Sequence, residues 1–230
     1  MSVHTDKPKR ESRLIIKICG IRDSDNLQHA IQAGANAIGF MQVPTSPRYI
    51  TAEEAGALRK EITAHNNDFN SKVLAVAVVA NQDQAEVKNI LELVQPDLVQ
   101  FHGDESEDFC QSFSIPYIKA IQATSAEDIR VVVAKYPSAN YLLLDSPTTL
   151  LGGSGQVFNW NRIPQAGASK DSPLVDKLII AGGLNARNVT ELLQMVKPAG
   201  VDVSSGVEEA RGIKNPRMMK EFVAAAQTLS

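Results

Sequence analysis

The chain has 230 residues, of which 43% are hydrophobic and 21% charged, with a formal net charge of −3 at pH 7. This balance is close to that of an average globular protein and excludes a disordered or collagen-like chain, and we expect neither nucleic acid nor a membrane as a partner. The longest fully apolar run, residues 73–80, is much shorter than the roughly 20 residues that span a bilayer.

Cysteine content and the first residues indicate the compartment. Two cysteines, Cys19 and Cys110, are too few for a disulfide framework. Residues 1–12 are polar and aperiodic and lack the apolar core of a secretory signal, so they predict a flexible N-terminal extension. We therefore expect a reduced, cytoplasmic protein whose main domain covers residues 13–230.

Short apolar runs alternate with amphipathic stretches along that domain. The predicted strands are residues 14–19, 35–40, 72–79, 98–101, 117–120, 141–145, 177–181 and 200–203. Each strand-plus-helix unit is about 27 residues long, which is usual for a βα repeat. Several strands are continuous apolar runs, as expected for parallel strands that are covered on both faces.

Helix signals fill the segments between the strands. Val87, Ile90, Leu91 and Val94 follow the spacing of a helix that packs on a core. The other signals are potential caps at Asp23 and Ser24 with Gly34 at the far end, capping boxes at Thr51–Glu54 and Thr124–Glu127, an N-cap and proline at Asn215–Pro216, and a weak helical pattern over 158–163.

Eight βα units in one α/β chain predict a single (β/α)8 TIM barrel. The competing architecture is an open, doubly wound sheet. Against it, no Gly-x-Gly-x-x-Gly turn follows the strand at 14–19, and the glycine-rich turns come late in the chain. Late glycine turns suit a barrel, whose phosphate site commonly follows the seventh and eighth strands.

The predicted active site lies where the strands end. Cys19 ends the first strand, and its alternatives are a small buried apolar residue or a thiolate that accepts a proton. A thiolate needs a cation nearby, and Lys17 is not expected to supply it, because it shares the face of Cys19 but lies lower in the barrel. Cys110, within a helical stretch, is expected to serve packing.

Asp145 ends the apolar run at 141–145 and would either pair with a cation or act as an acid. A carboxyl group in such a half-desolvated position can keep its proton near neutrality and donate it. Cys19 and Asp145 together would supply one base and one acid across the barrel mouth. That pair is the minimum needed to move a proton between carbon and oxygen.

Three glycine-bearing turns predict a phosphate site. Glycine allows a backbone N–H to approach a phosphate oxygen closely, and a following helix adds partial positive charge. A single such turn is more often only a tight turn. The candidate phosphate ligands are Gly153, Ser154, Gly155, Gly182, Gly183, Ser204, Ser205 and Gly206.

Arg48 and His102 complete the candidate site. Arg48 follows two prolines in the loop after residues 35–40 and would either be solvated or clamp a carboxylate. His102 could exchange a proton near neutrality or simply hydrogen-bond the site. No histidine–carboxylate pair has the spacing of metal ligands, so neither a metal nor a dinucleotide cofactor is predicted.

Six segments occur in the order typical of one enzyme family. They are KICGI (17–21), FMQVPTSPRYI (40–50), VQFHGDE (99–105), LLLDSPTTLLGGSGQVFNW (142–160), LIIAGGLNARNV (178–189) and VDVSSGVE (201–208). In this order the chain, from about residue 14 onward, closely resembles the phosphoribosylanthranilate isomerase family of tryptophan biosynthesis. The resemblance implies an Amadori rearrangement of N-(5-phospho-β-D-ribosyl)anthranilate to 1-(2-carboxyphenylamino)-1-deoxy-D-ribulose 5-phosphate, without cofactor or metal.

The same resemblance implies a role for each candidate residue. Asp145 would be the general acid and Cys19 the general base, and the substrate's iminium would supply a cation beside the thiol. Arg48 would hold the anthranilate carboxylate, and His102 and Asp202 would line the pocket. The departures from the family pattern are small: Ser154 stands where threonine is common, and Asn159 and Asn215 where aspartate is usual.

Three rivals remain at this stage. A ribonucleotide-linked sugar isomerase would be expected to end its first strand in aspartate, but cysteine stands there. An indole-glycerol-phosphate synthase would need motifs around a catalytic lysine that we do not find. A non-catalytic barrel that binds a phosphorylated metabolite or a protein is the rival of a different class. We expect a monomer, since no coiled-coil or apolar stripe requires a partner.

Overall fold

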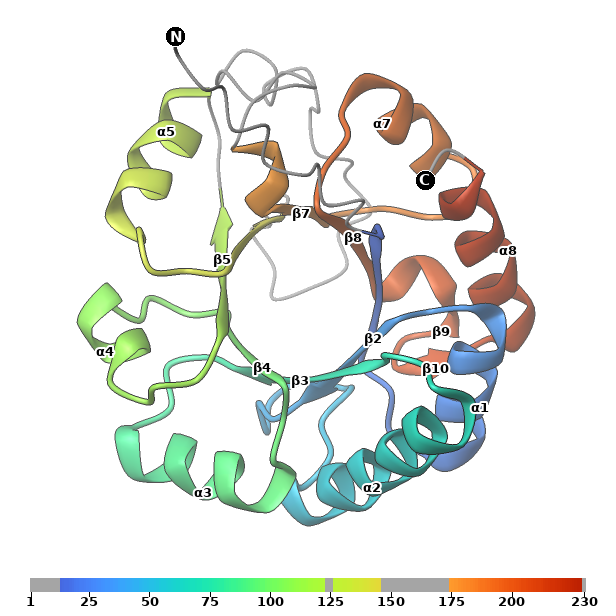
Figure 1. The fold of residues 1–230 in the computed structure, drawn as a ribbon, viewed down its shortest axis with the longest axis horizontal. Coiled ribbons are helices and arrows are strands. Elements are labelled where there is room, and N and C mark those ends of the chain that lie inside the picture. Colours follow the sequence, from blue (N-terminus) through green and yellow to red (C-terminus); the bar gives the residue numbers. More distant parts are fainter. Residues whose placement is uncertain (1–12, 123–125, 146–173, 229–230) are drawn as a thin grey trace, which may run out of the picture.

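A computed structural model describes residues 13–122, 126–145 and 174–228 (Figure 1). The predicted extension at 1–12, the Thr124–Glu127 capping box, the turn at 153–155 and the helical pattern at 158–163 fall wholly or partly outside these residues. Among the helices of the described residues, none is long and apolar enough to cross a membrane.

Eight parallel strands form a closed barrel, so the predicted TIM barrel is confirmed and the open sheet is wrong (Figure 1). The strands are β1 Ile15–Cys19, β2 Ala37–Met41, β3 Leu74–Val79, β4 Leu98–Phe101, β5 Tyr117–Gln122, β6 Tyr141–Asp145, β7 Leu178–Ile180 and β8 Gly200–Val203. Closure is made by β1 and β8, which pair in parallel with Lys17 opposite Asp202. The predicted ranges match these strands to within one or two residues at each end.

Helices surround the barrel. They are α1 Ser24–Ala33, α2 Ala52–Phe69, α3 Gln84–Val94, α4 Glu107–Gln111, α5 Ala126–Lys135, α7 Val189–Met195 and α8 Pro216–Gln227, with 3-10 turns η1 Val175–Lys177 and η2 Ser205–Val207. The predicted caps at Asp23, Gly34 and Asn215 are confirmed, as is the Thr51–Glu54 capping box. At Gly34 the chain turns into the left-handed region, with φ of 100°, which glycine adopts without steric cost.

Two apolar layers hold the barrel together. Side chains that alternate outward along the strands pack against the helices, and a smaller inner cluster that includes Val76, Leu143 and Ile179 fills the barrel. Lys17, Gln100 and Asp202 interrupt the inner layer with polar atoms, although each is at least nine-tenths buried. Burying polar atoms costs free energy unless they are paired, so these three side chains mark the part of the barrel that is not built for stability alone.

A short antiparallel hairpin after η2 was not predicted from the sequence. Its strands are β9 Glu208–Ala210 and β10 Ile213–Lys214, joined through Gly212. At two or three residues each, these strands are too short to show a period-2 pattern. Gly212 has φ of 82°, and a methyl group there would lie 2.7 Å from the carbonyl oxygen of Pro47. The hairpin therefore packs closely against the loop between β2 and α2.

Candidate active site

The barrel brings Cys19 and Asp145 to the same end. Both are the last residues of their strands, and in a parallel barrel all strands end at one mouth. Gln100 of β4 and Asp202 of β8 lie in the barrel wall below the rim, and His102 follows β4 directly. The predicted collection of chemical groups at one mouth is thus found in the fold.

Cys19 is buried and closely packed. The residue is 5% exposed and lies opposite Gly39 of β2. A methyl group at Gly39 would lie 2.8 Å from Cys19 Sγ and 3.1 Å from Lys17 Nζ, so thiol and ammonium border the same small space. Burial raises the pKa of the Cys19 thiol, and the positive charges of Lys17 and Lys214 offset part of that rise.

The prediction that Lys17 cannot help Cys19 is wrong. Alternation correctly places Lys17 one pair lower on the same face, but its long side chain extends along the barrel interior toward the rim. Nζ lies 2.8 Å from Asp202 Oδ1 and also interacts with the thiol. The position of Lys17 on the strand determines the direction of its Cβ, but its flexible four-carbon side chain allows the ammonium group to lie closer to the rim.

Asp145 faces a histidine whose other nitrogen is held in place. His102 Nε2 lies 3.6 Å from Asp145 Oδ2, and the two side chains are about one-third exposed. Gln100 Nε2 lies 2.8 Å from His102 Nδ1. With the amide in this orientation Nδ1 accepts, so the ring proton of a neutral His102 is on Nε2, directed at the carboxylate. The sequence analysis identified His102 as a candidate but missed Gln100. The signal that could have indicated Gln100 is its polar amide within an otherwise apolar strand.

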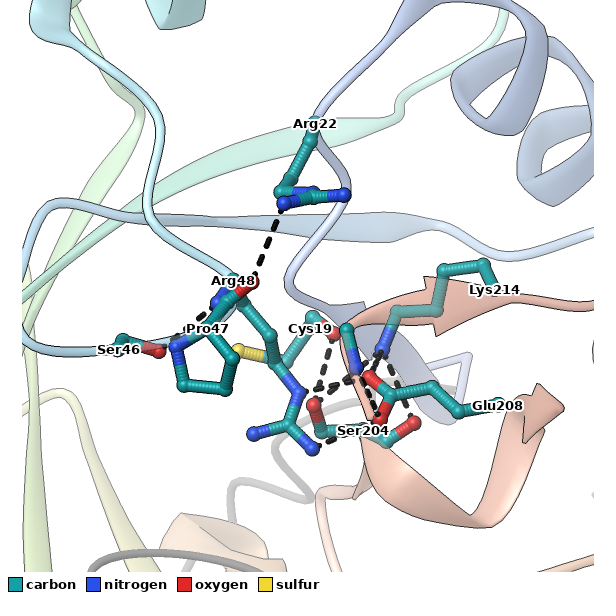
Figure 2. A network of polar contacts seen from close by, with 9 residues as sticks. Cys19, Arg22, Ser46, Pro47, Arg48, Ser204, Glu208 and Lys214 are labelled. Carbon is teal, nitrogen blue, oxygen red and sulfur yellow. Dashed lines mark hydrogen bonds and ion pairs between the residues drawn. The ribbon is translucent and has the colours of Figure 1, made fainter. Parts of the chain in front are cut away.

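Arg48 is neither solvated nor unpaired (Figure 2). It is 8% exposed, and its Nε and Nη2 donate to the two carboxylate oxygens of Glu208 at 2.6 and 2.8 Å. Lys214 Nζ lies 2.7 Å from Glu208 Oε1 and donates to the carbonyl oxygen of Ser204. The alternative of a surface arginine is therefore wrong, and the fork is already engaged by a carboxylate of the chain itself.

Glu208 was missed by the sequence analysis, although it ends the quoted segment VDVSSGVE. Burial raises its pKa, but hydrogen bonds from Arg48 and the charge of Lys214 outweigh this and lower the pKa to about 2. Arg48 also lies against the end of β1, since a methyl group at Gly20 would be 2.7 Å from Arg48 Cδ. Figure 2 shows Cys19 beside this network.

Replacing Glu208 with glutamine should remove a pH-dependent part of the stability. Because the folded-state pKa, about 2, is below the ordinary value of 4.5, the wild-type carboxylate stabilises the fold above about pH 4.5. That contribution, about 3 kcal/mol from the 2.5-unit difference, is lost as the pH falls from 4.5 toward 2.

Urea unfolding between pH 3 and 7 tests this expectation. Glu208→Gln should be less stable than wild type at pH 7, and the gap should narrow as the pH falls below 4.5. Glu221→Gln, at an exposed helical ion pair with Arg217, is the control and should change little at any of these pH values. A gap that stays constant with pH would contradict the prediction.

Two of the three glycine turns converge. Gly182 and Gly183 have φ of 78° and 69° and follow β7, while Ser204, Ser205 and Gly206 follow β8. A methyl group at Gly206 would overlap the carbonyl oxygen of Leu184, so the two turns are in direct contact. Ser204 also donates through Oγ to the carbonyl oxygen of Cys19. The third predicted turn, Gly153, Ser154 and Gly155, lies outside the described residues.

Cys110 is fully buried in the outer apolar layer, and burial raises the pKa of its thiol to about 12. This environment agrees with the predicted packing role. Within the described residues, no group of three or more His, Cys, Asp or Glu side chains could hold a metal ion.

Comparison with known proteins places these residues in a family context. A family model described as N-(5'phosphoribosyl)anthranilate (PRA) isomerase matches residues 16–225. The chain is 41% identical over 215 residues to an N-(5'-phosphoribosyl)anthranilate isomerase of Hahella chejuensis, covering 93% of this chain and 94% of the relative. It is 40% identical over 212 residues to one of Nitrosomonas europaea, covering 92% and 94%.

Solved structures give the same result. The phosphoribosyl anthranilate isomerase of Thermotoga maritima matches with a TM-score of 0.80 at 32% identity, over 94% of this chain and 100% of that one. A second phosphoribosyl anthranilate isomerase structure, in complex with reduced 1-(o-carboxyphenylamino)-1-deoxyribulose 5-phosphate, matches with a TM-score of 0.77 at 30% identity, with the same coverage.

Proposed function

The chain belongs to the N-(5'-phosphoribosyl)anthranilate isomerase family, and on that premise we propose that Cys19 and Asp145 are the base and acid of its reaction. The protein is an aldose–ketose isomerase of tryptophan biosynthesis, which converts N-(5-phospho-β-D-ribosyl)anthranilate into 1-(2-carboxyphenylamino)-1-deoxy-D-ribulose 5-phosphate. The observation that carries the assignment is the position of the two groups at one mouth, with Arg48 beside the thiol.

The proposed reaction moves only protons, so it requires no redox cofactor. Asp145 donates a proton to the ring oxygen, the bond from that oxygen to C1 breaks, and the anilino nitrogen forms an iminium with C1. The Cys19 thiolate then takes the proton from C2, and the electrons of that bond form the enolamine. Loss of the C2 hydroxyl proton and protonation of C1 complete the ketone. The iminium draws electrons from the C2–H bond, and its positive charge favours the thiolate beside it.

We propose that Arg48 binds the anthranilate carboxylate while it stays paired with Glu208. Glu208 occupies Nε and Nη2, so the substrate carboxylate would approach from the side of Nη1. The nearby Lys214 keeps the cluster cationic, with two positive side chains to one carboxylate. Glu208 thereby fixes the direction of the guanidinium before substrate arrives.

The phosphate end of the substrate is proposed to bind the three glycine turns. The contact between the β7 and β8 turns supports a shared site for Gly182, Gly183, Ser204, Ser205 and Gly206. The proposed site includes Gly153, Ser154 and Gly155, which lie outside the described residues, on the glycine pattern of the sequence and on the family resemblance. His102 and Asp202 are proposed to line the pocket between the phosphate and carboxylate ends.

Arg48→Ala should weaken substrate binding more than it slows chemistry. Loss of a buried carboxylate–guanidinium pair is expected to cost about 2–5 kcal/mol, seen as a rise in KM with a smaller change in kcat. Arg22→Ala is a matched control, because Arg22 is exposed and, within the described residues, its guanidinium donates to the carbonyl oxygen of Pro47. An unchanged KM in Arg48→Ala would contradict the carboxylate assignment.

A coupled assay tests the activity. The labile substrate is generated in situ from anthranilate and phosphoribosyl pyrophosphate, and its turnover is followed as the loss of anthranilate-type fluorescence. Enzyme-dependent loss of fluorescence is the expected result. A barrel that only binds a phosphorylated metabolite would instead bind a reduced product analogue without turning over the substrate.

We further propose a monomeric, cytoplasmic enzyme with one catalytic domain over residues 13–230. Among the residues that the structure describes, the large exposed apolar side chains are scattered singly over different elements: Tyr49, Phe69, Leu93, Val131 and Ile213. The phosphoribosylanthranilate isomerase of Thermotoga maritima, in contrast, is dimeric. Light scattering coupled to size exclusion should give the mass of one chain, 24.9 kDa, and a doubled mass would contradict the proposal.

A further inference from the structure

A buried ion pair lies directly beneath the proposed base, and the mechanism above does not use it. Lys17 is fully buried, Asp202 is 8% exposed, and 2.8 Å separates Nζ from Oδ1. Barrel interiors are normally filled with apolar side chains, and an apolar pair of similar volume is often at least as stable as a buried ion pair. Stability alone therefore gives no reason for this pair.

The ammonium of Lys17 is shared between two acidic groups. On one side it is bonded to Asp202, which lies opposite Lys17 on β8. On the other side it borders the space at Gly39, where the thiol of Cys19 also lies. Any side chain beyond glycine at position 39 would displace the ammonium, the thiol or both, because its first carbon would lie within 3.1 Å of each.

We propose that Lys17 is a positioning residue that supplies the cation needed by the Cys19 thiolate, and that Asp202 anchors this cation and limits its effect. The proposal rests on Cys19 being the proton acceptor. Lys17 itself touches no reacting atom and acts through the sulfur. Asp202 would then have an electrostatic role toward the thiol in addition to lining the pocket.

The charges around the thiol give the proposal a definite sign. Those that face Cys19 are Lys17 on its own strand, Asp202 on β8, Lys214 on β10, Arg48 in the loop after β2, and Glu208 on β9, which Arg48 and Lys214 pair. Burial raises the pKa of the thiol, Lys17 lowers it and Asp202 raises it. Removing the charge of Lys17 should therefore raise the pKa of the Cys19 thiol, and removing the charge of Asp202 should lower it.

A purely structural ion pair predicts the contrary. Removing either partner would then loosen the same region, so both variants would change the pKa of the Cys19 thiol in the same direction or leave it unchanged. The sign of the two shifts thus separates electrostatic positioning from support of the fold.

The test measures the thiol of the substrate-free, full-length enzyme. Cys110→Ala provides a background in which Cys19 is the sole thiol, since the sequence has two cysteines. The rate of alkylation by iodoacetamide is followed from pH 7 to 11, because burial raises the pKa of Cys19 above the ordinary thiol value. It is measured for this background and for Lys17→Met and Asp202→Asn made within it. We expect the midpoint to rise by about one unit or more in Lys17→Met, which slows alkylation about tenfold or more below the midpoint, and to fall in Asp202→Asn.

Two further variants guard against loss of structure. The double variant Lys17→Met/Asp202→Asn leaves no unpaired charge, and its alkylation midpoint should lie between those of the single variants. If Lys17→Met does not fold, the effect of Lys17 is obtained by comparing the double variant with Asp202→Asn, and the double variant should have the higher midpoint. Lys119→Met breaks a comparable buried pair, with Glu105, on the opposite side of the barrel and should leave the Cys19 midpoint unchanged. Shifts of the same sign in both single variants, or none, would overturn the proposal.

Turnover distinguishes this proposal from the one on which it rests. In Lys17→Met the rising limb of kcat/KM against pH should move up with the alkylation midpoint, and raising the pH should recover activity. If Cys19→Ala kept its turnover, the base assignment would fall whatever the thiol titration showed. If Cys19→Ala were inactive while Lys17→Met titrated like wild type, only the role of Lys17 would fall.

Discussion

Cys19→Ser is expected to lower kcat at least 10²–10⁴-fold, the range typical for removal of a general base. Serine is nearly isosteric with cysteine, but its hydroxyl ionises far less readily, so it cannot serve as the proton acceptor at C2. Little rearrangement is expected, because the residue is 5% exposed and bordered by Gly39 and Lys17. The fluorescence assay measures kcat and KM for the variant.

Cys110→Ser is the matched control for this substitution. Cys110 is fully buried in the outer layer, away from the mouth, so the same chemical change should leave kcat nearly unchanged. Placing a hydroxyl in an apolar position should instead lower the free energy of unfolding, by about 1–3 kcal/mol. A full turnover rate in Cys19→Ser would remove the base assignment and leave the fold untouched.

Asp145→Asn should be about as harmful, with kcat reduced roughly 10²–10⁴-fold. The amide has the shape of the carboxyl group but cannot transfer a proton to the ring oxygen, so opening of the ribose ring becomes the slow step. Affinity for a reduced product analogue should change much less than kcat, because that molecule needs no proton from Asp145. Steady-state kinetics and calorimetric binding separate the two effects.

Asp104→Asn is the control for Asp145→Asn. Asp104 is an exposed aspartate in the loop after β4 at the same end of the barrel. The variant therefore tests whether loss of any carboxylate at the rim lowers kcat. Its kcat is expected to stay within a few-fold of wild type. Equal losses in the two variants would show that the overall charge of the mouth, rather than a specific acid, limits the reaction.

Local patterns in the sequence were sufficient to predict the barrel. Apolar runs marked each of its eight strands because parallel strands between two packed layers must be apolar on both faces. Capping residues located helix ends such as Asp23 and Asn215, since the unpaired N–H groups there need a nearby acceptor. The hairpin formed by β9 and β10 escaped prediction because its strands are too short to carry a period.

Pairings across the barrel could not be predicted from those patterns. Arg48 and Glu208 are separated by 160 positions, and their contact depends on how the hairpin packs against the loop after β2. The contact of Gln100 with His102 depends on side-chain rotation, which strand alternation does not specify. Lys17 shows the same limit, because its charge lies far from its Cα.

The seam between β1 and β8 has a consequence for how the protein is made. Lys17 emerges from the ribosome early, whereas its counterion Asp202 is 185 positions further on. Until β8 docks, β1 would have to bury an uncompensated ammonium group, which is costly enough to keep this strand in water. A nascent chain that stops before β8 should therefore stay susceptible to proteases along β1. Once β8 is complete, we expect the barrel to close and the surroundings of the Cys19 thiol to form in one cooperative event.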